Sequence, residues 1–562
     1  MYHQTSGLEQ DVKRPVWEII ALVLILITAA GLRFAGLSDY FPLFWDEAKY
    51  LGEVEGSVPQ FGVNPAAFAL LKLGHAILGR PSYAQAVFAM IGLLTVVGCF
   101  LLGRRILGGR NGTYLGLLMA GQAAVMPYFL KYSRHAFPAG VALCAFVFAL
   151  FFYIQRLGFP RLHSAVARWK YTIASGTAIG LLALVPACSF NLLVPTVVLF
   201  ALSEIVVWRT RPARRTTLAG GAARQCASGS TSVFIISLVG GAVLFFVLPF
   251  ALATVSGYHG WLEHAIALLR SHVEIGTMRF GLQCLYPAHL YHLSGPVVVA
   301  CGLAGAIVLF AKRGRKALPP PGHGTNLIML VGFAVYVLFF GLFSHLQSAR
   351  LYALTLPFVV YASSYFLLWA FRALPRVGTA VTVAVSVLIF TLSSWSALVS
   401  VSAPTGFKTA SDIIARQVCR GQSVRASAAA QIAYGLAISP FLKVPGLTVD
   451  SYLTPAGPDA GSGQSPIAVI NDPTDIATTV ATLEKYDALS ELDLDTVRAG
   501  IQGYAPDPAT TQPVFAGRDD FCREPYYYLE DVYSWRSYRY IKELLRTARD
   551  SIFVYVPKVA EP

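Results

Sequence analysis

Residues 83–105 read YAQAVFAMIGLLTVVGCFLLGRR, an uncharged run of 21 residues closed by two arginines. A helix of about 20 apolar residues spans the hydrocarbon core of a bilayer, and cations at its end stay among the headgroups. The whole chain has this character, because 55% of its 562 residues are hydrophobic and only 13% are charged. A soluble domain carries about 25% charged residues. The sequence therefore excludes a soluble enzyme, a disulfide-rich secreted module and a disordered chain.

Apolar stretches of similar length recur along the first 400 residues, and each is long enough to cross a bilayer as a helix. The predicted spans are residues 16–34, 83–103, 112–128, 138–155, 171–187, 190–208, 232–255, 295–311, 326–343, 350–371 and 377–399. The sequence thus predicts a polytopic α-helical membrane protein with about eleven transmembrane helices.

The formal net charge of +14 is concentrated in alternate connections between these spans. The clusters are Lys13 and Arg14; Arg104, Arg105 and Arg110; Arg156, Arg161, Arg168 and Lys170; Arg209, Arg211, Arg214, Arg215 and Arg224; Lys312, Arg313, Arg315 and Lys316; and Arg372 and Arg376. Because cytoplasmic loops carry the excess of Lys and Arg, the alternation predicts a cytoplasmic N-terminus and cytoplasmic clusters. It also disfavours nucleic-acid binding as the reason for a basic chain. The loops 35–82 and 256–294 are then expected on the external face.

Downstream of residue 402 the composition becomes that of a soluble domain of about 150 residues. Helical patterns alternate there with strand-like runs at residues 466–470 and 552–556. We therefore expect two units, a transmembrane module of residues 1–402 and an external mixed α/β domain of residues 403–562.

Cys419 and Cys522 are the only two cysteines downstream of residue 402, and they lie toward the two ends of this C-terminal region. An oxidising exterior permits a disulfide between them. The sequence leaves this bridge and two free thiols equally open, since spacing does not test disulfide geometry.

An acidic pair follows the first span, where residues 44–50 read FWDEAKY. A carboxylate partly shielded from water gains basicity, so Asp46 or Glu47 could accept the proton of an attacking hydroxyl. The pair could equally cap a surface helix, since acidic residues favour a first turn. The residues alone leave both interpretations open.

Cations at the membrane edge also stand on the predicted external side: Lys131 and Arg134 in a short turn, and Arg350 near the start of a later span. A guanidinium group suits bidentate recognition of phosphate. The alternative for each is an anchor that reaches the lipid headgroups. Together with the acidic pair, these cations indicate an anionic substrate that arrives from the lipid.

The loop 256–294 contains five histidines among aromatic residues, but their spacing fits no compact zinc ligand set. An interfacial loop is the main interpretation, because such loops are rich in amphipathic side chains. Contact of Tyr286 or His289 with a substrate is an alternative, and a metal site is a weaker one. No metal site is therefore assigned.

The motif Asp46-Glu47-x-x-Tyr50 resembles the acidic signature of the GT-C membrane glycosyltransferases. The branch it resembles is glycosyltransferase family 39, with the protein mannosyltransferases and lipid A aminoarabinose transferases. Further resemblances, within about residues 15–400, are the second span and its turn at 84–110, the external turn Tyr132-Ser133-Arg134-x-Ala136-x-Pro138, and Arg350 with Pro357 at a later span.

The resemblance implies a glycosyltransferase of the bacterial cytoplasmic (inner) membrane. Such an enzyme moves a hexose or pentose, with inversion, from a polyprenyl-phosphate donor to an external glycan, lipid or protein acceptor. Asp46 would be the general base, Glu47 would orient it or the sugar, and Tyr50 would contact substrate. The residues implied to bind the donor phosphate are Arg134, Arg350, Lys49 and Lys131.

Two alternatives remain: a polytopic transporter or lipid flippase, and a non-catalytic subunit of a cell-envelope polysaccharide assembly system. Ion-coupled transporters keep ionisable residues near mid-membrane. Such residues are nearly absent from the predicted spans, and the main exception, Glu204, lies near a cytoplasmic end. Family members often carry an acidic residue after the external turn, where this chain has Ala139 and Gly140. No cofactor is therefore carried over, although a divalent metal remains open.

Overall fold

The computed structural model describes most of the predicted transmembrane module and short stretches of the C-terminal region. The described residues are 16–35, 50–51, 54, 65–79, 83–136, 138–157, 165–188, 192–210, 251, 290–291, 294–311, 323–340, 349–374, 377–402, 409, 413, 423–426, 448–449, 467–471, 511–518 and 551–557.

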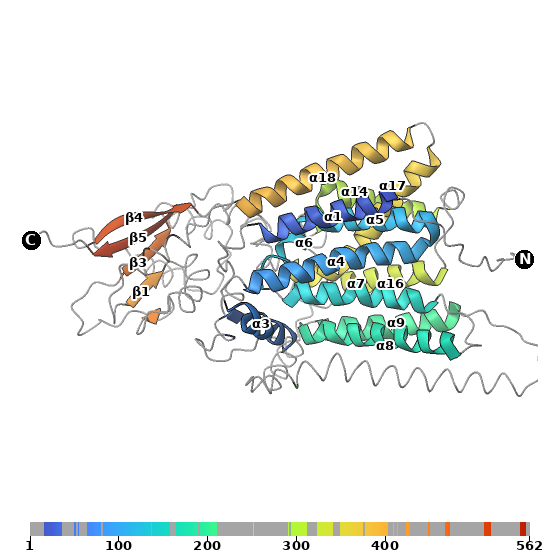
Figure 1. Cartoon of the computed structure of the whole chain (residues 1–562), viewed down its shortest axis with the longest axis horizontal. Helices are drawn as coiled ribbons and strands as arrows, with labels where there is room; N and C mark the ends of the chain where they lie inside the picture. The colour runs from blue at the N-terminus through green and yellow to red at the C-terminus, as the bar shows by residue number, and fades with distance from the viewer. Residues whose placement is uncertain are drawn as a thin grey trace, which may run out of the picture.

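The first part of the chain is a bundle of helices that run side by side (Figure 1). The helices are α1 (Val16–Phe34), α3 (Pro65–Leu78), α4 (Tyr83–Leu107), α5 (Gly109–Val125), α6 (Pro127–Lys131), α7 (Pro138–Leu157), α8 (Ala165–Cys188), α9 (Leu193–Thr210), α14 (Pro296–Phe310), α16 (His323–Leu338), the 3₁₀ helix η5 (Ala349–Thr355), α17 (Leu356–Ala373) and α18 (Gly378–Ser402). Ten of the eleven predicted spans coincide with these helices. The other, 232–255, lies outside the described residues apart from Ala251.

Five helical stretches among the described residues are long and apolar enough to cross a membrane: Val16–Phe34, Tyr83–Leu107, Pro138–Gln155, Tyr352–Ala373 and Gly378–Trp395. Five shorter apolar helices accompany them. The chain is therefore a multi-pass helical protein of the kind the composition predicted. One predicted boundary differs, because the span 112–128 ends as a helix at Val125, before Pro127.

The centre of the bundle consists of α4, α5, α7 and α17, whose facing side chains are buried. Small residues allow the close approach of α4 and α5, since a Cβ added at Gly103 would lie 2.8 Å from the Cα of Gly116. The peripheral helices α1 and α18 instead carry large exposed apolar side chains, such as Ile27 and Trp395. Lipid contact accounts for these apolar outer faces.

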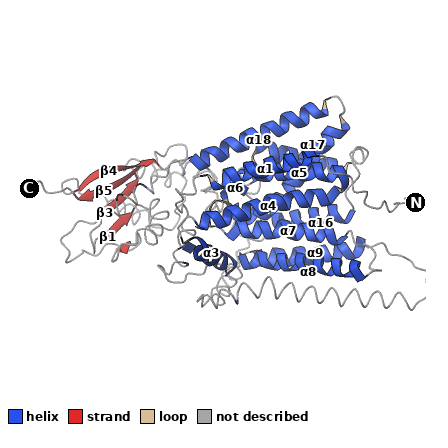
Figure 2. Cartoon of the chain, in the orientation of Figure 1, coloured by secondary structure: helices blue, strands red, loops and turns tan. Residues whose placement is uncertain are grey.

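The described strands form one five-stranded sheet beyond one end of the bundle, as Figure 2 shows by colour. Its strands are β1 (Ser423–Ala426), β2 (Thr448–Val449), β3 (Ile467–Asn471), β4 (Thr511–Arg518) and β5 (Ser551–Pro557). Their order is β2-β1-β3-β5-β4, with β1 parallel to β2 and β3, and β5 antiparallel to β3 and β4. The two predicted strands at 466–470 and 552–556 are therefore confirmed as β3 and β5, which pair with Val469 opposite Val554.

Candidate functional site

Two turns at one end of the helical bundle are rich in arginine. The turns between α4 and α5 and between α17 and α18 lie at the end away from the sheet (Figure 1). They carry Arg104, Arg105, Arg110 and Arg372, which belong to the predicted cytoplasmic clusters. Helix α6 lies toward the other end, on the side of the sheet (Figure 1). The arginine-rich turns and the candidate site therefore occupy opposite ends of the bundle.

A break between α5 and α6 gives the site its local shape. Helix α5 ends at Val125, and Met126 adopts an extended conformation with φ −61° and ψ 130°. Pro127 then begins α6, at a helix position that tolerates its missing N–H. The short helix α6 thus separates α5 from α7, which begins at Pro138. We call residues 126–136 the α5–α7 turn.

The α5–α7 turn is tightly packed, and Arg134 is its one side chain that is not buried. Every residue from 122 to 136 is buried except Arg134, which is half-buried. The backbone N–H of Arg134 donates to the carbonyl of Lys131 at 3.1 Å, and Ser133 Oγ donates to the Leu130 carbonyl at 2.9 Å. Arg134 is therefore presented by a rigid segment.

The side chains of Arg134 and Lys131, the two predicted cations, differ in their surroundings. Arg134 Nη1 donates a hydrogen bond of 2.8 Å to the backbone carbonyl of Leu32, near the end of α1. Lys131 is buried, with Nζ 5.3 Å from the ring centroid of Tyr132. The structure thus brings both predicted cations into one turn and leaves Arg134 the more accessible of the two.

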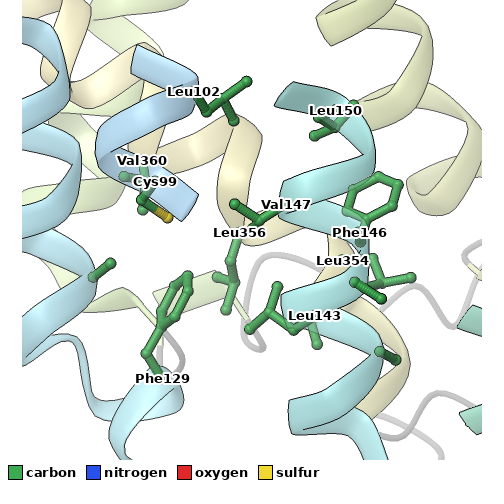
Figure 3. Packing of buried hydrophobic residues seen from close by; sticks show 14 of the residues in the cluster. Cys99, Leu102, Phe129, Leu143, Phe146, Val147, Leu150, Leu354, Leu356 and Val360 are labelled. Carbon is green, nitrogen blue, oxygen red and sulfur yellow. The ribbon is translucent and has the colours of Figure 1, made fainter. Parts of the chain in front are cut away.

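Helix α6 is attached to the hydrophobic core through the side chain of Phe129. Phe129 points from α6 into the cluster that contains Cys99 of α4, Leu143 of α7 and Leu356 of α17 (Figure 3). Its side chain is 3% exposed. Close packing of this ring between three other helices resists displacement of the turn.

One arginine that the sequence reading did not select lies beside this turn. Arg33, in the last turn of α1, is fully buried. It donates hydrogen bonds to the carbonyls of Ala124 (2.9 Å), Ala123 (3.1 Å) and its own helix at Ala29 (3.2 Å). The signal that could have found it is a cation at the predicted external end of a span, against the positive-inside trend.

Near the acidic motif the structure describes Tyr50, Leu51 and Val54. Tyr50 is half-buried and packs against the main hydrophobic cluster, while Leu51 and Val54 are buried. Lys72 of α3 donates from Nζ to the Val54 carbonyl at 2.6 Å. The segment that follows the acidic pair is therefore fixed to α3.

Arg350 is the second residue of η5, and this short helix contacts α7, α16 and α17. The residues after it, Tyr352 to Leu356, are all buried, and Thr355 Oγ1 donates to the Tyr352 carbonyl at 2.6 Å. Because η5 packs against α7, this segment adjoins the helix that follows the α5–α7 turn.

Several predicted residues lie outside the described part of the chain: Asp46, Glu47, Lys49, Tyr286, His289, Cys419 and Cys522. Among the residues that are described, no group of three or more His, Cys, Asp or Glu side chains comes together as a metal site would require.

No protein-family model matches the sequence, and no curated protein matches it. Its architecture does match solved structures of membrane transferases, so the chain has a GT-C-like fold, as the motif resemblance implied. One such structure is ArnT from Cupriavidus metallidurans bound to undecaprenyl phosphate. The TM-score is 0.51 at 11% identity, over 97% of this chain and 98% of that chain.

A second similar structure is the oligosaccharyltransferase of Archaeoglobus fulgidus tethered with an acceptor peptide that contains the NVT sequon. The TM-score is 0.50 at 11% identity, over 94% of this chain and 72% of that chain. At such identities the similarity establishes a shared fold, and the chemistry of this chain has to be argued from its own residues.

Proposed function

We propose that this chain is a membrane glycosyltransferase that moves a sugar from a polyprenyl-phosphate donor to an acceptor on the external face, with inversion. The single observation that carries the proposal is Arg134, the one residue of 122–136 that is not buried. It is held on a rigid turn at the end of the bundle away from the arginine-rich turns. A protein of the same fold binds undecaprenyl phosphate, which supports a lipid phosphate as the ligand.

The electrostatics of the reaction explain why an arginine should stand there. When a sugar leaves its carrier, negative charge develops on the phosphate oxygens. Fixed donors aimed at this developing charge lower the barrier, and they act most strongly where water is excluded. The planar guanidinium of Arg134 can bind two phosphate oxygens at once. We assign supporting phosphate contacts to Lys131, Lys49 and Arg350.

The acidic pair supplies the other half of the chemistry in this proposal. Asp46 takes the proton of the acceptor hydroxyl, whose oxygen attacks the anomeric carbon of the donor sugar. The bond from that carbon to the phosphate oxygen breaks, and its electron pair leaves with the carrier phosphate. A single displacement of this kind inverts the anomeric configuration. Glu47 orients Asp46 or the sugar, and Tyr50, with Tyr286 or His289, contacts substrate.

The proposed topology follows the charge pattern. The arginine-rich turns and the N-terminus face the cytoplasm, and the site faces the exterior of a bacterial inner membrane. Residues 403–562 form an external α/β domain in this arrangement. The sheet lies beyond the end of the bundle toward which α6 is placed, which supports that assignment (Figure 1).

The test compares Arg134→Ala with Arg372→Ala in membranes supplied with undecaprenyl phosphate that carries a labelled hexose or pentose. Arg372 is the control at the other end of the bundle, where it is exposed and donates a hydrogen bond from Nη2 to Asn111 Oδ1 at 2.9 Å. Release of undecaprenyl phosphate, measured by mass spectrometry, should fall about 100-fold in Arg134→Ala only. If the unmodified protein releases none with any donor, the transporter or assembly-subunit alternative replaces the proposal.

A further inference from the structure

Arg33 is a buried cation whose two terminal nitrogens are hydrogen-bonded to backbone carbonyls. A charged side chain that is 0% exposed within a membrane-spanning helix is expensive unless it is fully paired. In the described part of the chain its hydrogen-bond partners are three backbone carbonyls, two of which lie about 90 positions away on α5. The side chain therefore joins the end of α1 to the end of α5.

Pro127 explains why the carbonyl of Ala123 needs another donor. In an unbroken α-helix the N–H of residue 127 would donate to the carbonyl of Ala123, but proline has no N–H. The last carbonyls of a helix also carry partial negative charge. Arg33 supplies N–H groups and a positive charge to Ala123 and Ala124, so it caps α5 where the chain breaks.

Gly92 of α4 makes room for this cap. A Cβ added there would lie 2.7 Å from Arg33 Nε and would collide with the Cβ of Ser133. Arg33 Nε is the nitrogen of that guanidinium without a hydrogen-bond partner among the described residues. Arg33 and Ser133, which precedes Arg134, thus pack against one spot on α4.

The same end of α1 also holds the exit of the turn, because the carbonyl of Leu32 accepts the 2.8 Å hydrogen bond from Arg134 Nη1. Leu32 and Arg33 are consecutive, so one stretch of backbone fixes both where the α5–α7 turn starts and where Arg134 lies. A shift at Arg33 would therefore move the Arg134 guanidinium.

We propose that Arg33 is a positioning residue that holds the α5–α7 turn so that Arg134 meets the phosphate of a lipid carrier. The part that concerns the phosphate rests on the proposed function; the part that concerns the turn does not. Arg33 itself is too deeply buried to contact the ligand, so it acts through Arg134.

The experiment has two readouts on purified protein in nanodiscs: hydrogen exchange of peptides that cover 122–136, and binding of undecaprenyl phosphate. Arg33→Met removes the charge and donors while it keeps an unbranched apolar side chain. We expect faster exchange in this segment and binding weakened about 10- to 100-fold. Arg33→Lys should recover part of both effects, since it keeps the charge but not the planar fork.

Two further variants separate positioning from a loss of stability. Arg105→Met is the control at the opposite end of the bundle, where the exposed Arg105 also donates to a carbonyl of another helix, that of Gln155 at 3.2 Å. It should change neither readout. Gly92→Ala keeps every charge yet pushes Arg33 and Ser133 away from α4, so it should weaken binding as Arg33→Met does. If Arg33→Met fails to fold, Gly92→Ala still tests the positioning role.

The double variant Arg33→Met with Arg134→Ala should bind no more weakly than Arg134→Ala alone, since Arg33 acts through Arg134. Additive losses would overturn the positioning role, as would unchanged exchange and binding in both Arg33→Met and Gly92→Ala. If the unmodified protein binds no undecaprenyl phosphate, the proposed function fails, and the exchange of 122–136 still decides whether Arg33 holds the turn.

Discussion

The guanidinium of Arg134 donates a 2.8 Å hydrogen bond to the carbonyl of Leu32, a residue 102 positions earlier in the chain. This contact joins the turn before α7 to the end of α1 and fixes the one accessible side chain of an otherwise buried segment. A guanidinium held in place at this end of the bundle is the arrangement that the proposed phosphate-binding role requires.

Arg134→Lys tests whether the planar guanidinium group contributes to sugar transfer beyond its positive charge. A lysine ammonium is a point charge that cannot bind two phosphate oxygens in one plane. We expect sugar transfer from a polyprenyl-phosphate donor to fall about tenfold or more. Arg372→Lys, at the other end of the bundle, should leave transfer unchanged. Equal rates for Arg134→Lys, Arg134→Ala and the unmodified protein would reduce Arg134 to a headgroup anchor.

Asp46→Asn tests the proposed base. The substitution is nearly isosteric, but an amide cannot accept the acceptor's proton. Loss of a general base lowers the rate by about 100- to 10,000-fold, whereas loss of a helix cap would lower stability by about 1 kcal/mol. Binding of undecaprenyl phosphate should be retained. Glu47→Gln should have the smaller effect on transfer, and transfer by Asp46→Asn at the original rate would remove Asp46 from the mechanism.

Phe146→Ala tests the core of the bundle. Phe146 of α7 is 0% exposed, and its ring meets Tyr336 at 5.4 Å and Phe358 at 5.8 Å in edge-on contacts. Loss of such a ring lowers the free energy of unfolding by about 3–5 kcal/mol. Thermal unfolding in detergent should show the decrease. Ile27→Ala, on the exposed face of α1, is the control and should shift the midpoint little, because Ile27 is 62% exposed.

The orientation in the membrane is tested with introduced cysteines. In intact cells, a membrane-impermeant maleimide should label Ser462→Cys in the proposed external domain. Arg110→Cys, an exposed position in the first turn of α5, should react only after lysis. The unmodified protein measures the background from native thiols. The reverse pattern would place the site in the cytoplasm.

A disulfide between Cys419 and Cys522 would close a loop of about 100 residues and could stabilise the C-terminal domain by about 2–4 kcal/mol, the typical contribution of a disulfide. Peptide mapping without reductant should recover the linked pair of peptides. Two free thiols in protein purified without reductant would refute the bridge.

Much of the fold could be predicted because span formation is a local property. A stretch such as 83–103 becomes a helix because lipid leaves its backbone no other hydrogen-bond partners, whatever its neighbours are. The strands at 466–470 and 552–556 were also predicted from local patterns. The break at Pro127 is local in the same sense. Its consequence, a carbonyl at Ala123 without its usual donor, could have been read from the sequence.

Which residues come together at the site depended on packing. The sequence marked Arg134 and Lys131 as cations on an unusual side and proposed a phosphate role for them. It gave no reason to choose between the two, because burial of Lys131 follows from helices that are distant in the chain. Arg33 was also evident in the sequence as a cation, but the sequence did not show that it would bind the carbonyls of Ala123 and Ala124.

The sequence by itself therefore determined the membrane class, the positions of most spans and the separation of arginine-rich turns from the candidate site. The tertiary structure alone decided that Arg33 caps α5, that Gly92 makes room for it, and that Leu32 holds Arg134. The physical reason is that apolar length and local charge act within one helix, whereas a buried hydrogen bond needs two helix ends whose approach is set by side-chain packing across the bundle.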